Sequence, residues 1–151
     1  MELHRTRSQR LVACGAVALL LLSACSSKPE DKVTLYPVRG KVTFDGKPTE
    51  GATLTLWALK SDVKLDQAPT AYVKPDGTFV VGTTAAENGA PAGEYEVSIL
   101  WFPPNARQIT QSTGKMPELL LPKMYSDPKK SGLKITVREE PNDLPEFQLQ
   151  K

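Results

Sequence analysis

The segment EYEVSILW, residues 94–101, decides the fold. Its large apolar side chains, Tyr95, Val97, Ile99 and Trp101, stand on alternate residues, and the residues between them are mostly polar. A period of two places these side chains on one face of a β-strand, whereas a helix would spread them around its circumference. The segment therefore predicts a strand with one buried face, and Trp101 is expected in the core.

Short runs of the same kind recur along the chain, separated by turn residues. They span residues 38–44, 52–59, 70–73, 78–81, 133–137 and 147–149. Asp45-Gly46 and Asp76-Gly77 lie between neighbouring runs, and Asp-Gly is a strong turn signal because Gly accepts positive φ. The chain also has 13 Pro and ten Gly. About seven strands, with no helix expected beyond a turn or two, predict an all-β, antiparallel β-sandwich over residues 36–151.

One long segment, residues 103–132, has no period-two order. Loops longer than about 12–15 residues are uncommon in compact domains and tend to be functional or disordered. Its second half contains LLLPKMY (119–125), which is apolar enough to pack on the sandwich. We expect residues 106–115 to be disordered and the second half to be docked.

The first 24 residues differ in character from the rest and predict a signal peptide. His4, Arg5, Arg7 and Arg10 form a basic head, followed by an uncharged apolar run at 11–22. A run of about a dozen residues is too short to cross a bilayer, which needs roughly 20. A basic head, a short apolar region and small residues are what a signal peptide requires. A short transmembrane anchor and an N-terminal core helix remain the alternatives.

The end of this segment, Leu22-Ser23-Ala24-Cys25, resembles the lipobox of bacterial lipoproteins. The resemblance implies a diacylglycerol on the Cys25 thiol, cleavage between Ala24 and Cys25, and acylation of the new amine by a fatty acid such as palmitate. One acyl chain holds a protein only marginally, and two or more make anchoring stable. An ordinary signal peptide with a chance cysteine is the alternative.

The residues from Cys25 onwards predict a flexible tether and the cellular location of the protein. Residues 25–35 are mostly polar and are predicted to be a flexible tether that carries the lipidated cysteine. Ser26 stands where an Asp is linked to inner-membrane retention in some bacteria. An exported, membrane-anchored lipoprotein of the outer membrane or cell surface is therefore expected.

Charge excludes one class of partner. The chain has 19 basic and 17 acidic residues. Removal of residues 1–24 takes away three Arg and one Glu, which leaves 16 of each sign, interspersed along the chain. Without a basic stripe to neutralise phosphates, nucleic-acid binding is not expected.

The residue types of the mature chain argue against catalysis. His4 is the single histidine, and Cys14 and Cys25 are the only cysteines. Ser-His-Asp and Cys-His catalysis, a zinc site and a disulfide are therefore not expected. Asp45, Asp76 and Asp143 stand beside turn residues and are predicted to cap local backbone amides. No catalytic residue, no metal site and no cofactor beyond the acyl chains on Cys25 is predicted.

Two aromatic residues are candidate ligand contacts, Trp57 and Tyr125. Trp57 alternates with Leu54 and Leu56, so it lies either on the inner face of a fully buried strand or partly exposed on the outer face. Tyr125 belongs to the long segment at 103–132. Exposed Trp and Tyr side chains can stack on sugar rings or anchor a protein partner.

Four pieces of the mature chain together resemble a known family. They are VRGKVTFDGKPTEGATLTL (38–56), KPDGTFVV (74–81), NGAPAGEYEVSI (88–99) and LPKMYSDPKKSGL (121–133). In order and spacing they are similar to short bacterial lipoproteins with a carboxypeptidase-regulatory-like domain. The resemblance implies a transthyretin-like (prealbumin-like) sandwich, of the same general kind as an immunoglobulin-like one, and usually an accessory role. The hydroxyisourate-hydrolysing branch of that fold uses histidines, which the mature chain lacks.

The expected function follows from these observations. It is a lipid-anchored, non-catalytic module of the cell envelope with a structural or protein-interaction role. The alternative is a carbohydrate- or small-ligand-binding domain that uses Trp57 and the segment at 103–132. The expected partners are the membrane, through the lipid anchor, and envelope proteins or polysaccharide.

Overall fold

The computed structural model describes residues 33–60 and 65–151, and the predicted signal peptide and Cys25 lie outside this part. Its strands are β1 (Val38–Phe44), β2 (Lys47–Pro48), β3 (Thr53–Ala58), β4 (Thr70–Tyr72), β5 (Thr78–Val80), β6 (Gly93–Leu100), β7 (Lys134–Val137), β8 (Asn142–Asp143) and β9 (Phe147–Leu149). A helix, α1 (Ala106–Thr113), and a 3₁₀ turn, η1 (Lys123–Ser126), lie between β6 and β7.

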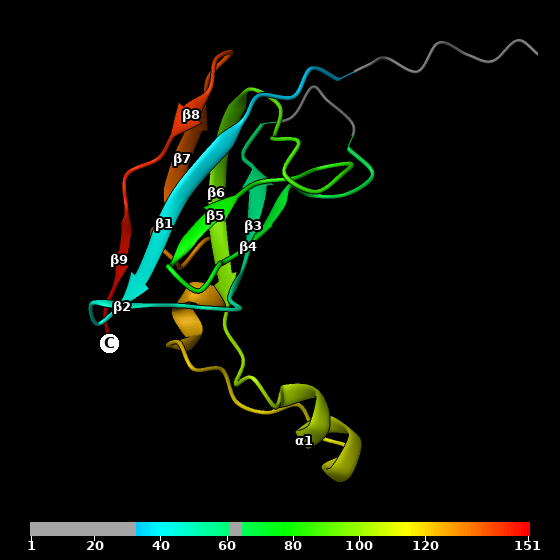
Figure 1. Cartoon of the computed structure of the whole chain (residues 1–151). Helices are drawn as coiled ribbons and strands as arrows, with labels where there is room; N and C mark the ends of the chain where they lie inside the picture. The colour runs from blue at the N-terminus through cyan, green and yellow to red at the C-terminus, as the bar shows by residue number, and fades with distance from the viewer. Residues whose placement is uncertain (1–32, 61–64) are drawn as a thin grey trace, which may run out of the picture. The chain divides into compact units, whose positions relative to one another are not determined.

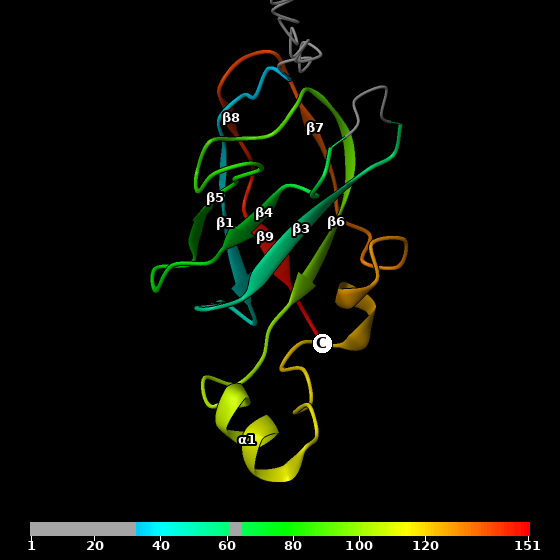
Figure 2. The ribbon, with the colours of Figure 1, turned by 90° about the vertical axis from the view of Figure 1, so that its right-hand side faces the viewer.

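The strands form two sheets (Figure 1). The four-stranded sheet has the order β4-β3-β6-β7, and all its neighbours are antiparallel. The five-stranded sheet is built around β1, which pairs with β2, β5, β8 and β9. Figure 2 shows β4, β3 and β6 side by side. The predicted all-β sandwich is confirmed.

The core lies between the two sheets and follows the predicted alternation. Tyr95, Val97 and Ile99 of β6 are buried, as are Leu54 and Leu56 of β3. The five-stranded sheet contributes Val38, Val42, Phe79, Phe147 and Leu149, and the rings of Phe79 and Phe147 stack at a centroid distance of 6.1 Å. Period two is a local property of the sequence, which is why the inner faces could be predicted.

The last two strands differ from the antiparallel pattern expected of the sequence. β8 and β9 run parallel to β1, with Asn142 opposite Val38 and Phe147 opposite Val42. β7 ends in the four-stranded sheet, and the chain then crosses to the other sheet. The crossing sets the direction of β8 and β9. The sequence pattern does not give it, because side chains alternate in the same way along a parallel and an antiparallel strand.

The segment predicted to be disordered at 106–115 is instead mostly the helix α1. Gly114 ends the helix in the left-handed conformation and donates its N–H to the carbonyl of Thr110 at 2.8 Å. Glycine is the residue that favours this helix end. α1 has no buried residue and stands off the sheets (Figure 1). A helix without a buried face needs no regularly spaced apolar residues, so its sequence lacks the pattern from which a helix is predicted.

The second half of the long segment is docked, as predicted. Leu121 and Tyr125 are buried in the core, and η1 lies against β6. Neither helical element of the described residues is long and apolar enough to cross a membrane.

Candidate functional site

Trp57 lies on the outer face of the four-stranded sheet, with 47% of its surface exposed. This settles the two alternatives for its position in favour of partial exposure. Its indole Nε1 donates a hydrogen bond to the Ser98 hydroxyl at 2.9 Å. Ser98 points to the same outer face from β6, yet only 4% of it is exposed. The indole thus lies over the serine and is held in one orientation.

The strand register places further polar and aromatic groups on this outer face. Thr53 stands opposite Tyr72 on one side and Leu100 on the other, and Tyr72 is 72% exposed. Thr55 stands opposite Thr70 of β4. A strand rises about 3.3 Å per residue, so the backbone positions of Trp57 and Tyr72 are roughly 14 Å apart. The surface between them is a row of hydroxyls.

The charges beside Trp57 are paired. Glu96 stands opposite Trp57 in the register and lies 3.8 Å from the Lys134 ammonium on β7. Only 16% of the Glu96 side chain is exposed, against 68% for Lys134, so the pair compensates a largely covered carboxylate next to the indole.

The other aromatic predictions concern Trp101 and Tyr125. Trp101 packs edge-on against Phe44, with ring centroids 6.3 Å apart, and donates its Nε1–H to the carbonyl of Glu50 at 2.9 Å. It therefore packs on the core, as the alternation predicts. Tyr125 is also part of the core, with 9% exposed. The structure does not bring Tyr125 together with Trp57, because one lies between the sheets and the other on an outer face.

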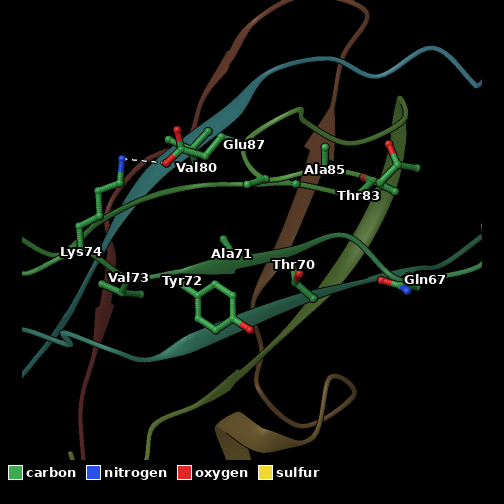
Figure 3. Close-up of a pocket in the computed structure, with 13 residues that line it drawn as sticks. Gln67, Thr70, Ala71, Tyr72, Val73, Lys74, Val80, Thr83, Ala85 and Glu87 are labelled. Atoms are coloured by element: carbon green, nitrogen blue, oxygen red, sulfur yellow. Dashed lines mark ion pairs between the residues drawn. The ribbon is translucent and has the colours of Figure 1, made fainter.

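A hollow opens beside Tyr72, between β4 and the segment from β5 to Glu87 (Figure 3). We call it the β4–β5 hollow. Its volume is about 460 Å³. It is lined by Gln67, Thr70, Ala71, Tyr72, Val73, Lys74, Val80 and residues 82–87. Figure 3 shows Lys74 and Glu87 at one end and Gln67 and Thr83 at the other.

The hollow exists because β4 and β5 separate in the middle and join at both ends. At one end, Thr70 and Gly82 exchange two backbone hydrogen bonds of 2.8 Å. At the other end, the Lys74 amide donates to the carbonyl of Thr78 at 2.8 Å. Strand alternation turns the backbone groups of Tyr72 and Val80 towards each other between these ends. Tyr72 and Val80 are not paired, because β4 pairs with β3 and β5 with β1.

The loop from Gly82 to Ala90 that forms the far wall is tightly bonded. The Thr83 amide donates to the side-chain oxygen of Asn88 at 2.8 Å, and the Thr83 hydroxyl donates to the carbonyl of Gly89 at 2.7 Å. Glu87 has φ of 58°, a left-handed conformation that is uncommon outside glycine. Its carboxylate lies 2.9 Å from the Lys74 ammonium.

Lys74 and Glu87 were missed by the sequence analysis. Lys74 reads as part of a Lys-Pro-Asp-Gly turn, and Glu87 as part of a polar loop. The two are brought together by the return of β5, and no local pattern joins them.

Of the three aspartates predicted to cap local backbone amides, Asp76 does so, whereas Asp143 bonds a distant side chain instead. Asp76 accepts hydrogen bonds from the amide and hydroxyl of Thr78 at 2.9 and 2.7 Å, and these lower the pKa of its carboxyl. Asp143 bonds the Arg39 guanidinium, which lowers the pKa of the aspartate. Asp45 is a turn residue with φ of 47°.

Within residues 33–60 and 65–151, no three His, Cys, Asp or Glu side chains form a group that could hold a metal ion. Among the buried tyrosines, Tyr95 has a shifted titration: burial raises the pKa of its phenol, and its hydroxyl donates to the carbonyl of Pro91 at 2.9 Å. Its position in the core makes it a packing residue.

Comparison with protein-family models, curated proteins and solved structures gives no match to this chain. The function is therefore inferred from the motifs and the surfaces described above.

Proposed function

We propose that this chain is a lipid-anchored, non-catalytic module of the bacterial cell envelope with a structural or protein-interaction role. The observation that carries the proposal is Leu22-Ser23-Ala24-Cys25 at the end of an apolar leader and in front of a small sandwich. Lipidation of Cys25 would hold the sandwich at a membrane surface through two or more acyl chains. Ser26 favours the outer membrane or the cell surface.

The outer face of the four-stranded sheet supports a binding role. Trp57 is exposed, yet its indole is oriented by the bond to Ser98. Tryptophan is enriched among the residues that contribute most to binding, and an ordered side chain loses less entropy when a partner binds. Trp57 is therefore the residue on this face that we expect to contact a partner.

Two features of the sequence support a non-catalytic role. The mature chain has no histidine and no unmodified cysteine, which are the commonest proton-transfer and nucleophilic groups. Its resemblance to carboxypeptidase-regulatory-like domains implies an accessory module. Turnover of any substrate by the purified chain would contradict this part of the proposal.

Metabolic labelling with an alkyne analogue of palmitate tests the anchor. We expect label on the wild-type protein, no label on Cys25→Ser, and undiminished label on the matched control Cys14→Ser. Cell fractionation should recover the labelled protein in the outer-membrane fraction. Equal labelling of wild type and Cys25→Ser would show that Cys25 is not the lipidated residue.

A second candidate function is the binding of a carbohydrate or another small ligand. Trp57 and Tyr72 favour it, because both are exposed aromatic rings on one outer face with threonine hydroxyls between them. Aromatic rings stack on sugars, and hydroxyls exchange hydrogen bonds with them. Glycan-array binding by the full chain that is lost in Trp57→Ala supports this version, and binding that survives the substitution contradicts it.

A further inference from the structure

The β4–β5 hollow has the size of a ligand site and carries backbone groups that do not pair with each other. Its volume of about 460 Å³ falls within the range of small-molecule pockets, about 300–1,000 Å³. The backbone groups of Tyr72 and Val80 face each other without bonding, although the pairs on both sides of them are bonded. Backbone donors and acceptors are strong hydrogen-bonding groups that need partners. A molecule in the hollow would supply them.

The ends of the opening exclude an extended peptide as the occupant. A peptide that adds to a sheet edge bonds to a run of alternate residues. Here a single residue on each strand, Tyr72 and Val80, lies between the bonded pairs Thr70–Gly82 and Lys74–Thr78. The opening therefore fits a compact ligand with several donors and acceptors.

The charge of the lining favours a neutral ligand. Lys74 and Glu87 are the charged residues among those that line the hollow, and they neutralise each other at 2.9 Å. Both are about half exposed, so the ammonium keeps free donors and the carboxylate keeps a free oxygen. An anion would lack a net positive partner, and a cation would lack a net negative one. Paired groups of this kind can instead bond to neutral hydroxyls.

The lining also offers hydroxyls. Tyr72 is exposed and, in Figure 3, its ring lies on the β3 side of β4, so the residue meets the opening with its backbone. Thr70, Thr83 and Thr84 add hydroxyl groups around the opening. The rigid loop that carries Glu87 holds the carboxylate in place, which reduces the entropy lost on binding.

We propose that the β4–β5 hollow binds a single unit of a neutral saccharide. Glu87 accepts from the sugar hydroxyls, and Lys74 donates to them. The backbone groups of Tyr72 and Val80 bond to the remaining hydroxyls. This inference rests on the proposed binding role of the module and gives it a ligand class, and it does not depend on the lipid on Cys25.

Amide-resolved NMR of the ¹⁵N-labelled full chain in detergent micelles tests the site. Glucose, galactose, mannose and N-acetylglucosamine are each added to millimolar concentration. We expect saturable shifts of the Tyr72, Val80 and Thr83 amides with at least one sugar. Absence of saturable shifts with all four, or shifts centred on Trp57 and Ser98, would overturn the proposal.

Three variants locate the binding further. Glu87→Gln should weaken binding of the responding sugar by about tenfold, because a hydrogen bond to a charged group is lost. Glu118 is a carboxylate of the long segment and lies outside the hollow. The control Glu118→Gln should therefore leave the affinity unchanged. Lys74→Met removes the ammonium donor of the lining, so it should also weaken binding with the amide spectrum otherwise intact. Unchanged affinity in both Glu87→Gln and Lys74→Met would contradict the assignment.

Two outcomes separate this inference from the proposals above. If Trp57→Ala abolishes sugar binding and the hollow variants do not, the outer face is the site and the hollow is not. If sugar binding fails in every variant and in the wild type while Cys25 is labelled, the saccharide inference is wrong and the lipid anchor stands.

Discussion

The hydroxyl of Tyr125 bonds both backbone groups of Gln150. It donates to the carbonyl oxygen at 3.1 Å and accepts from the amide nitrogen at 3.2 Å. Gln150 follows β9, which pairs with β1 and, among the described residues, has no strand on its other side. The hydroxyl therefore takes the position that a further strand would occupy. Sheet edges with unpaired backbone are sites of aggregation, and side chains that cover them are protective. Tyr125, a candidate ligand contact on sequence grounds, thus has a structural bond at the end of the sheet.

This bond predicts the effect of Tyr125→Phe. The variant keeps the buried ring and loses one bridging hydroxyl, so we expect the free energy of unfolding to fall by about 0.5–1.5 kcal/mol. Urea denaturation measures it. The control Tyr72→Phe removes an exposed hydroxyl and should change stability by less than about 0.5 kcal/mol. Equal losses in the two variants would show that the Gln150 bond is unimportant.

The two tryptophans should differ in their effect on stability. Trp101→Ala removes the packing against Phe44 and the bond to Glu50, and we expect a loss of about 3 kcal/mol. Trp57→Ala removes an outer-face ring and its bond to Ser98, and about 1 kcal/mol is expected. Urea titration followed by far-ultraviolet circular dichroism avoids the loss of the fluorescent group. A larger effect of Trp57→Ala would contradict the assignment of faces.

Gly89 should be far less replaceable than Gly46. A Cβ at Gly89 would lie 2.1 Å from the carbonyl oxygen of Tyr36, whose amide and carbonyl pair with Ala90. At Gly46 nothing lies within 4 Å, although its φ is also positive. Gly46→Ala should destabilise by about 1 kcal/mol through backbone conformation alone. Gly89→Ala adds the clash, and we expect at least about 3 kcal/mol by thermal or urea unfolding. Similar values for the two variants would refute this difference.

Asp76 should contribute to the fall of stability in acid. Its bonds to Thr78 lower the pKa of its carboxyl in the folded state below 3.8. The stabilisation is therefore complete above the unfolded-state pKa and is lost as the pH falls through the folded-state pKa. Asp76→Asn keeps a side-chain acceptor without the titration, so the acid limb of its stability curve should be flatter than that of the wild type. An identical acid limb would exclude this contribution.

Tyr95 should contribute to the loss of stability at alkaline pH. Burial raises the pKa of its phenol above 10.0, because the phenolate would be desolvated in the core. The stabilisation is present below the unfolded-state pKa and is lost as the pH rises through the folded-state pKa. Tyr95→Phe removes the titration and the bond to Pro91, so it should have a lower neutral stability and a flatter alkaline limb. Urea midpoints measured across the alkaline range check both expectations.

The sequence by itself determined the strands and their inner faces. The alternation at 94–101 predicts the buried set Tyr95, Val97 and Ile99, and the Asp-Gly turns mark where the chain reverses. Both signals are local, because side-chain direction along a strand depends only on parity and a turn depends on a few residues. Trp57 could be singled out as a candidate for the same reason, since parity separates it from Leu54 and Leu56.

Only the tertiary structure decided which of these segments became neighbours. Ser98 is buried because the indole of Trp57 lies over it, and Thr43 is buried because β9 brings Glu146 to its hydroxyl at 2.9 Å. The β4–β5 hollow depends on two strands that join at both ends and separate between. Such contacts link residues far apart in the chain. They leave no periodic pattern and no local motif in the sequence, so they could not be predicted from it.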